Sequence, residues 1–259
     1  MIETHHAELD GLPVVWRTAP AQKDPPTLYI HGVPDHGELW TPFLERTGGV
    51  APDLPGFGAS AKRGDLDYSI GGYADWLERF CGLAALDRVR LVMPDWGAVG
   101  LAFAQRAPER IERLVAIDTV PLLPGYRWHP IARAWRTPLL GEVAMGMAIR
   151  PVVRRLLPAG RVEPVLAAFD PGTQRAILKL YRASPPDVLA AAGARLADVD
   201  APALVLHGAR DRYIPPRFAD GLAAALGDGR VEHVADAGHW PWLDRPELVE
   251  RVAAFLRTP

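Results

Sequence analysis

The chain has 259 residues, of which 49% are hydrophobic, and this is enough for one large domain with a substantial core. The formal net charge is −2, without a long run of one sign, which argues against nucleic acid or an anionic membrane as a partner. The single cysteine excludes an internal disulfide and fits a cytoplasmic protein, and neither a signal peptide at residues 1–10 nor a membrane-spanning run of ~18 apolar residues is expected.

Short β-rich runs alternate with helical patterns in the first half of the chain. We expect strands at residues 27–30, 88–93 and 114–117, with helices at 70–83 and 99–106. The same pattern returns near the end, with strands at 203–206 and 230–234 and helices at 217–226 and 246–256. This alternation predicts an α/β fold, in which mostly parallel strands are joined by right-handed crossovers and covered by helices on both faces.

Between Pro121 and Leu196 the alternation stops. This stretch is rich in proline and arginine and has helical segments at 131–135, 143–157, 162–169, 173–181 and 188–196. An insertion between two core strands would lie over the carboxyl edge of the sheet, where α/β proteins bind ligands. We therefore expect a core in two parts, residues 1–120 and 197–259, with a helical cap at 121–196.

The most informative segment covers residues 91–100 and reads LVMPDWGAVG. An apolar strand leads into a tight turn and directly into a helix, which is the context of a nucleophile elbow with Asp95 in the place of a serine. A carboxylate there can attack carbon and form an alkyl ester, whose hydrolysis needs backbone donors such as the N–H of Trp96. The alternative is that Asp95 only caps the helix.

A second loop follows the first predicted core strand. Residues 31–40 read HGVPDHGELW, and this loop is placed to supply another anion-binding N–H, from Val33. The alternative is a plain turn built from glycine and proline. Residues 53–58, DLPGFG, are rich in turn formers and are assigned a structural role only.

Two polar residues come after late strands and should reach the same edge of the sheet. Asp211 lies in HGARDRYIP at 207–215, and His239 lies in AGHWP at 237–241. We expect His239 to deprotonate water, while Asp211 holds its tautomer and stabilises the imidazolium. Asp118, which follows the strand at 114–117, is a rival for the acid, but we expect it to be a turn or cap residue.

Together these segments resemble the α/β-hydrolase superfamily over nearly the whole chain. Its members place nucleophile, acid and histidine in this chain order. The Asp-Trp-Gly elbow at 95–97 resembles epoxide hydrolases and haloalkane dehalogenases, and Asp211 and His239 then match the family's acid and base. The sequence departs from the family at Pro94, where histidine or a similar residue usually precedes the nucleophile.

The resemblance favours epoxide opening over dehalogenation. Residues 31–34, HGVP, with Trp40 downstream, resemble the epoxide hydrolase pattern. Many dehalogenases carry a polar side chain at the position of Val33, where it helps the tryptophan of the elbow, here Trp96, to hold the halide. Dehalogenation stays open, because some dehalogenases recruit a second tryptophan from the cap, for which Trp128 and Trp135 are candidates.

Epoxide opening needs a proton donor for the ring oxygen, and the family takes it from cap tyrosines. Tyr181 resembles such a position, and Tyr126 is a second candidate, although a tyrosine in an amphipathic helix is often only a packing residue. The remaining residues that we expect to contact substrate are His31, Pro34, Tyr126, Trp128, Trp135 and Trp240.

We therefore predict a cytoplasmic epoxide hydrolase, monomeric or homodimeric, that takes small apolar substrates and water and needs neither a cofactor nor a metal. The first alternative is a haloalkane dehalogenase that uses Asp95, His239 and Asp211 with Trp96 as the halide donor. The second is a non-catalytic small-molecule binding protein of the same fold. A third is an ester hydrolase or cyclising enzyme in which Asp95 acts as a base.

Overall fold

The computed structural model describes residues 1–148 and 150–258. Among these residues the central sheet has eight strands in the order β1-β2-β4-β3-β5-β6-β7-β8. Their bounds are β1 (Glu3–Leu9), β2 (Leu12–Ala19), β3 (Thr27–Tyr29), β4 (Gly49–Pro52), β5 (Val89–Asp95), β6 (Ile111–Thr119), β7 (Pro202–Gly208) and β8 (Asp228–Val234). All pairs from β4 to β8 are parallel, so the predicted, mostly parallel sheet is confirmed.

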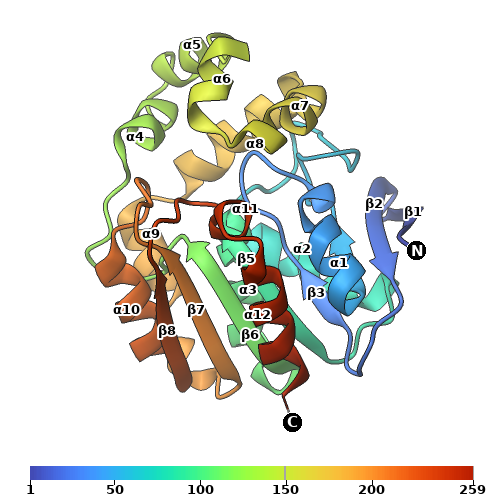
Figure 1. Ribbon diagram of the computed structural model, residues 1–259. Coiled ribbons are helices and arrows are strands. Elements are labelled where there is room, and N and C mark those ends of the chain that lie inside the picture. The colour runs from blue at the N-terminus through green and yellow to red at the C-terminus, as the bar shows by residue number, and fades with distance from the viewer. Residues whose placement is uncertain (149, 259) are drawn as a thin grey trace.

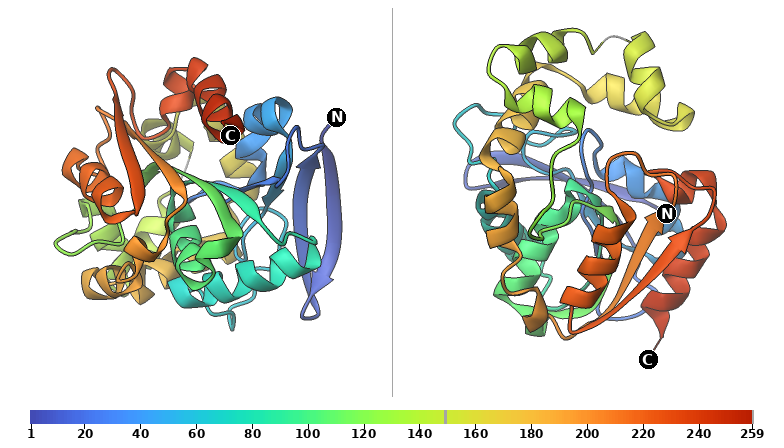
Figure 2. Two further views of the ribbon diagram at one scale, coloured as in Figure 1. Left: turned by 90° about the horizontal axis from the view of Figure 1, so that it is seen from below. Right: turned by 90° about the vertical axis from the view of Figure 1, so that its left-hand side faces the viewer.

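Helices cover both faces of this sheet (Figure 1; Figure 2). One face packs against α2 (Ile70–Leu83), α3 (Val99–Arg106) and α10 (Pro216–Ala225), and the other against α1 (Thr41–Thr47), α11 (Pro241–Asp244) and α12 (Glu247–Arg257). Successive side chains of β5 alternate between the two layers, because Leu91 and Met93 belong to the first apolar cluster and Val92 to the second. This two-sided burial explains why the central strands are apolar throughout.

The amino-terminal hairpin was not predicted. Strands β1 and β2 pair in antiparallel fashion, and β2 pairs in the same way with β4. The polar sequence of β1, ETHHAEL, hides its strand character because β1 lies at the edge of the sheet and buries no side chain fully. The polar residues Glu3–Leu9 therefore form an edge strand.

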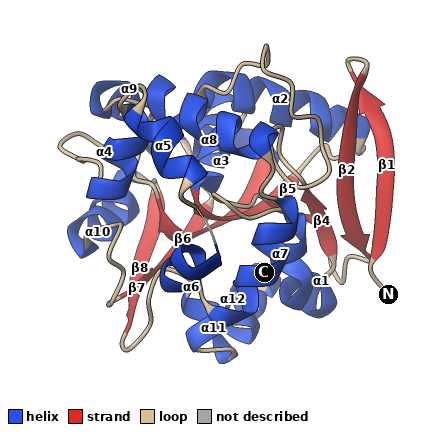
Figure 3. Ribbon diagram, turned by 90° about the horizontal axis from the view of Figure 1, so that it is seen from above, coloured by secondary structure: helices blue, strands red, loops and turns tan. Residues whose placement is uncertain are grey.

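The segment between β6 and β7 is helical, as the sequence indicates. The described α-helices are α4 (Pro130–Arg136), α5 (Leu140–Gly146), α6 (Arg150–Leu156), α7 (Ala159–Ala168), α8 (Pro171–Ala183) and α9 (Pro186–Ala192). Helices α4 to α7 stand beyond the upper edge of the sheet, and α8 leads from them back toward α9 beside the core (Figure 1; Figure 3). That residues 121–196 form a separate cap stays a prediction.

The single helix predicted at 143–157 is wrong, because two helices, α5 and α6, cover this stretch. Gly146 ends α5, and Pro151 lies in the first turn of α6, where its missing N–H costs nothing. Among the described residues, no helix combines the length and the apolar character that crossing a membrane requires.

A buried ion pair ties the helical segment to the loop after β3. Arg161 of α7 hydrogen-bonds through Nε to Oδ1 of Asp35 at 2.9 Å, and Nη2 contacts the same oxygen. The two side chains are 9% and 2% exposed. Because breaking a buried pair leaves an uncompensated charge, this contact fixes α7 relative to the core.

Candidate active site

Asp95 is held at a sharp turn between β5 and α3. Its backbone has φ 43° and ψ −121°, which is costly for a residue other than glycine and is typical of functional positions. A Cβ at Gly97 would lie 2.7 Å from the carbonyl oxygen of Ile30, and one at Gly32 would lie 2.7 Å from the Asp95 carboxylate. The small residues around the elbow are therefore required by the close approach of three backbone segments.

Each oxygen of the Asp95 carboxylate has a different neighbour. The backbone N–H of Val33 donates to Oδ2 at 2.8 Å. Nε2 of His239 lies 3.6 Å from Oδ1. The Asp95 side chain is 13% exposed, so the carboxylate is largely buried but can be reached. One oxygen is therefore fixed by a backbone donor, and the other faces the histidine.

The opposite nitrogen of the His239 ring is bound to Asp211. Nδ1 lies 2.7 Å from Oδ2 of Asp211, whose Oδ1 accepts hydrogen bonds from the backbone N–H groups of Tyr213 and Ile214 at 2.6 and 3.3 Å. Burial alone would lower the pKa of His239. The charge of Asp211, its hydrogen bond to the ring and the nearby Asp95 carboxylate instead raise this pKa well above its usual value. The imidazolium form is thus favoured while both carboxylates are charged.

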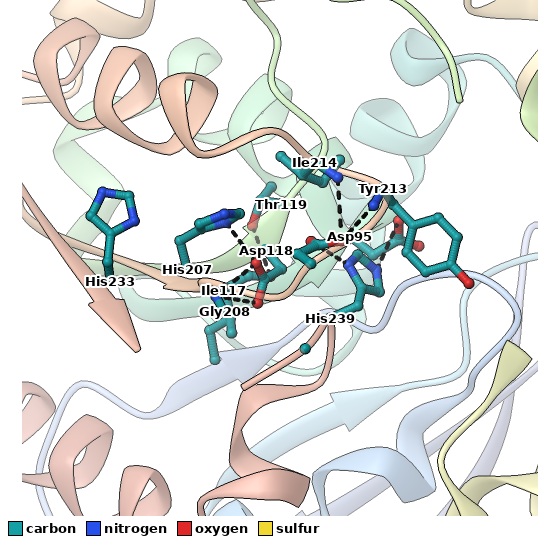
Figure 4. A network of polar contacts seen from close by, with 12 residues as sticks. Asp95, Ile117, Asp118, Thr119, His207, Gly208, Tyr213, Ile214, His233 and His239 are labelled. Carbon is teal, nitrogen blue, oxygen red and sulfur yellow. Dashed lines mark hydrogen bonds and ion pairs between the residues drawn. The ribbon is translucent and has the colours of Figure 1, made fainter. Parts of the chain in front are cut away.

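Asp118 lies close to Asp211 in the buried polar cluster, and Figure 4 shows it beside His207 and Gly208. It is 1% exposed, has φ 43°, and accepts hydrogen bonds from the N–H of Gly208 at 3.0 and 3.1 Å. Nδ1 of His207 lies 2.7 Å from its Oδ1, although not in hydrogen-bond geometry. Burial and the nearby charge of Asp211 raise the pKa of Asp118 well above its usual value, so we expect this carboxyl to keep its proton.

Three side chains in this cluster have the spacing of metal ligands. Asp118, Asp211 and His239 offer ligand atoms that all lie within 4.8 Å of one another. However, His239 and Asp211 already contact each other directly, and a protonated Asp118 would be a poor ligand. We therefore describe the group as a hydrogen-bonded cluster and not as a metal centre.

A cavity of about 390 Å³ opens above Asp95 and His239. Its walls are mainly apolar and come from the loop after β3, from α4 to α8, and from the loops that carry Tyr213 and Trp240. Of the residues predicted from the sequence, those that line this cavity are Val33, Pro34, Asp95, Trp135, Tyr181, His239 and Trp240. Their roles as catalytic or binding residues stay predictions, but the fold brings them together.

Trp96, which was predicted to bind the anion, does not line this cavity, and neither do three of the residues predicted to bind substrate. His31 uses both ring nitrogens, since Nε2 accepts from the N–H of Leu54 at 2.9 Å and Nδ1 lies 2.8 Å from the carbonyl oxygen of Gly32. Burial lowers the pKa of His31 to about 4, so it is a neutral structural residue. The sequence pattern could not distinguish a histidine that holds two loops together from one that faces a ligand.

Trp128 and Tyr126 are the other two corrections. The indole N–H of Trp128 donates to the carbonyl oxygen of Ser184 at 2.8 Å, which leaves this group no hydrogen for a halide. Tyr126 is 1% exposed and packs edge to face against Trp128 and Phe218. Both residues therefore support the wall of the site from behind.

Trp96, the residue after Asp95, forms an aromatic contact with Tyr181. Their ring centroids are 5.1 Å apart in an edge-to-face arrangement. The indole nitrogen of Trp96 is buried and lacks a hydrogen bond of normal geometry, although it lies near enough to Tyr181 to affect that residue's pKa. A buried donor without a well-formed hydrogen bond is costly, so this N–H beside Asp95 is available to an anion.

Besides the apolar lining, sequence reasoning missed two polar aromatic residues of the cavity wall, His129 and Tyr213. The Tyr213 ring packs edge to face against His239 with centroids 5.0 Å apart, and His129 packs against Tyr213 at 4.9 Å. The signals were slight: Tyr213 follows the predicted acid by two positions, and His129 precedes a proline at the start of a helix. Neither pattern by itself indicates a cavity.

Known proteins resemble this chain over most of its length. Residues 28–252 match the model of the alpha/beta hydrolase family. A haloalkane dehalogenase of Bradyrhizobium diazoefficiens is 28% identical, covering 98% of this chain and 93% of the relative. A haloalkane dehalogenase of Mycolicibacterium paratuberculosis is 30% identical, covering 89% of this chain and 83% of the relative.

Solved structures agree in fold. The haloalkane dehalogenase DbeA from Bradyrhizobium elkani superposes with a TM-score of 0.85 at 26% identity, covering 99% of this chain and 98% of that one. The haloalkane dehalogenase DatA from Agrobacterium tumefaciens has a TM-score of 0.84 at 21% identity, with 98% and 96% coverage, and shows likeness of fold alone.

Proposed function

The chain belongs to the α/β-hydrolase family, in its haloalkane dehalogenase-like branch, and from this premise we propose that it hydrolyses the carbon–halogen bond of small, largely apolar haloalkanes. It is a hydrolase, and the sequence-based preference for epoxides gives way to the first alternative because the two relatives described above are named haloalkane dehalogenases. The observation that carries the proposal is the Asp95 carboxylate at the wall of an apolar cavity, with one oxygen fixed by Val33 and the other facing His239.

In the first step the Asp95 carboxylate attacks the carbon that bears the halogen. The new carbon–oxygen bond forms as the carbon–halogen bond breaks, and the halide leaves with the electron pair. Since Val33 holds Oδ2, the oxygen that faces His239, Oδ1, is the nucleophile in this proposal. The indole N–H of Trp96, which lies beside Tyr181 and makes no hydrogen bond of normal geometry, is the group that would stabilise the departing halide.

In the second step His239 removes a proton from water, and the hydroxide attacks the carbonyl carbon of the ester. Esterification removes the negative charge of Asp95, one of the groups that raise the pKa of His239, so the imidazole becomes able to act as a base at this stage. The Val33 N–H already binds Oδ2, and it would stabilise the oxyanion that forms there. The products are an alcohol, a halide ion and a proton.

A second candidate function is epoxide hydrolysis, and Tyr181 supports it. This residue lines the cavity, and burial, together with the charge of Asp95, raises its pKa well above 10. It therefore keeps its proton and could donate it to the oxygen of an opening epoxide while Asp95 attacks carbon. A non-catalytic binding protein and an enzyme that uses Asp95 as a base have no comparable supporting contact.

The test is a product assay with two substrates offered in parallel. Purified protein would be given 1-bromohexane and a terminal aryl epoxide, and bromide and diol would be measured. We expect bromide release that is lost in Asp95→Asn and strongly reduced in Trp96→Phe. Diol without bromide would replace the proposal by epoxide hydrolysis, and Tyr181→Phe would then be inactive. A cytoplasmic location and the oligomeric state stay predictions.

A further inference from the structure

We propose that His129 is a substrate-binding residue, which offers a neutral N–H donor in the cavity to an uncharged oxygen acceptor carried by the substrate. The cavity is otherwise mainly apolar, and, apart from Asp95 and His239, the titratable side chains that line it are His129, Tyr181 and Tyr213. Of these three side chains, His129 is the one with a ring nitrogen that accepts a hydrogen bond from the backbone. This contact determines what the ring can offer to a ligand.

The backbone sets the tautomer of His129. As the N-cap of α4, its Nδ1 accepts a hydrogen bond from the backbone N–H of Ala132 at 3.3 Å. A nitrogen that accepts a hydrogen bond carries no proton, so in the neutral ring the hydrogen resides on Nε2. Within residues 1–148 and 150–258, no side chain or backbone group hydrogen-bonds to Nε2. The ring therefore has one free donor.

The surroundings keep this ring uncharged. Burial lowers the pKa of His129 to about 4, and this effect outweighs the opposing charge of Asp95. His129 is therefore neutral at neutral pH, and its donor can be satisfied by a carbonyl, ether or hydroxyl oxygen. A carboxylate would gain no ion pair with His129 and would be repelled by Asp95. The site should thus prefer polar but uncharged ligands.

The position of the ring orients such a ligand. His129 packs against Tyr213, which packs against His239, so the three rings form one wall of the cavity. A substrate that hydrogen-bonds to His129 would then place another part of its chain at Asp95. The identity of the substrate class rests on the proposed dehalogenation. On that basis the substrates are haloalkanes with a ketone, ether or hydroxyl oxygen away from the carbon–halogen bond.

The binding test does not depend on turnover. Dissociation constants of cyclohexanone and methylcyclohexane, which are similar in size, would be measured by ligand-observed NMR. The ketone loses more hydration than the hydrocarbon on entering an apolar cavity, so the readout is the ratio of the two affinities in wild type relative to the variants. We expect the affinity for the ketone divided by that for the hydrocarbon to be about tenfold higher in wild type than in the variants, in line with one hydrogen bond to an otherwise unpaired donor. His129→Ser keeps an N-cap with a side chain much shorter than the imidazole, and His129→Phe keeps a ring without a donor.

Three results would overturn the inference. They are an affinity ratio that is the same in wild type and in both His129 variants, a ratio that rises in these variants, and a ratio that falls in Tyr213→Phe alone. Nitrogen NMR of His129 adds an independent readout, because the inference requires a neutral ring protonated at Nε2 at pH 7. A protein that binds the ketone as expected but releases no halide would contradict the proposed function and leave the binding site standing.

Discussion

Oδ1 of Asp95 and Nε2 of His239 lie 3.6 Å apart, too far for a hydrogen bond of normal length but close enough for each charge to stabilise the other. The histidine is bound firmly on its other side, where Nδ1 lies 2.7 Å from Asp211. In the proposed reaction this arrangement leaves Oδ1 of Asp95 free to bond to carbon, with His239 next to it as the base. The protonation of His239 would then depend on whether Asp95 is charged or esterified.

The first prediction concerns the covalent intermediate. His239→Gln should form the alkyl ester on Asp95 but fail to hydrolyse it, because attack by water needs a base while attack by the carboxylate does not. Intact-protein mass spectrometry after incubation with 1-bromohexane should show one added hexyl group and one bromide released per protein. Asp95→Asn is the control and should show neither. A variant that turns over at the wild-type rate would exclude His239 as the base.

The second prediction concerns the pKa of His239. Asp211 and Asp95 both raise it, so Asp95→Asn should move the pKa downward, toward the value favoured by burial. Proton NMR titration of the ring in wild type and variant measures the shift directly. Asp65→Asn, a change at an exposed site, is the control and should leave the pKa in place. No downward movement would mean that the Asp95 charge is not felt by His239.

The third prediction separates the two buried acids. Since Asp118 is expected to keep its proton, Asp118→Asn replaces one neutral polar group by another, and activity should fall by no more than about threefold. Asp211→Asn removes the charge that stabilises the His239 imidazolium, so kcat should fall on the order of a hundredfold or more. Steady-state halide release measures both. The reverse order would assign the catalytic acid to Asp118.

The fourth prediction concerns stability. Asp35→Ala leaves the Arg161 guanidinium buried without its carboxylate and should lower the free energy of unfolding by about 3–5 kcal/mol. The double variant Asp35→Leu, Arg161→Met should recover most of the loss, because it leaves no buried charge. Urea unfolding measures both changes. Asp65→Ala, which breaks an exposed pair with Arg63, should leave the urea midpoint unchanged.

The fifth prediction concerns the stability of the folded protein at acidic pH. Burial lowers the pKa of folded His31 to about 4, whereas an unfolded histidine titrates near 6.5. Between these values the unfolded chain binds more protons, so the stability associated with a neutral His31 is complete above pH ~6.5 and decreases as the pH falls toward 4. From pH 7 to pH 5 the loss from this one residue is about 2 kcal/mol.

His31→Gln removes this titration and also one backbone contact. It should therefore be less stable than wild type at pH 7, and the difference between the two proteins should shrink at pH 5. Urea midpoints of the two proteins at pH 7 and pH 5 measure this difference in stability. A difference that stays constant or widens on acidification would mean that His31 is protonated in the folded protein.

Much of the fold and of the polar cluster could be predicted because the signals are local. The elbow at Asp95 is encoded by one contiguous segment of strand, turn and small residues. Because the strands are parallel, Asp211 and His239 lie at the same edge of the sheet at which β5 ends. The hairpin of β1 and β2 could not be predicted from the sequence, because an edge strand need not be apolar. The break between α5 and α6 was missed because Pro151 can begin a helix as well as end one.

The chain order and residue types alone determined the α/β class, and they led to the prediction of Asp95 as the nucleophile with Asp211 and His239 as its acid and base. Only the tertiary structure decided which aromatic and histidine side chains face the cavity. His31, Trp128 and Tyr126 are occupied elsewhere, while His129 and Tyr213 form the wall. The physical reason is that a strand fixes the edge at which its last residue lies, whereas the direction of a side chain in an inserted helix depends on distant contacts such as Arg161 with Asp35.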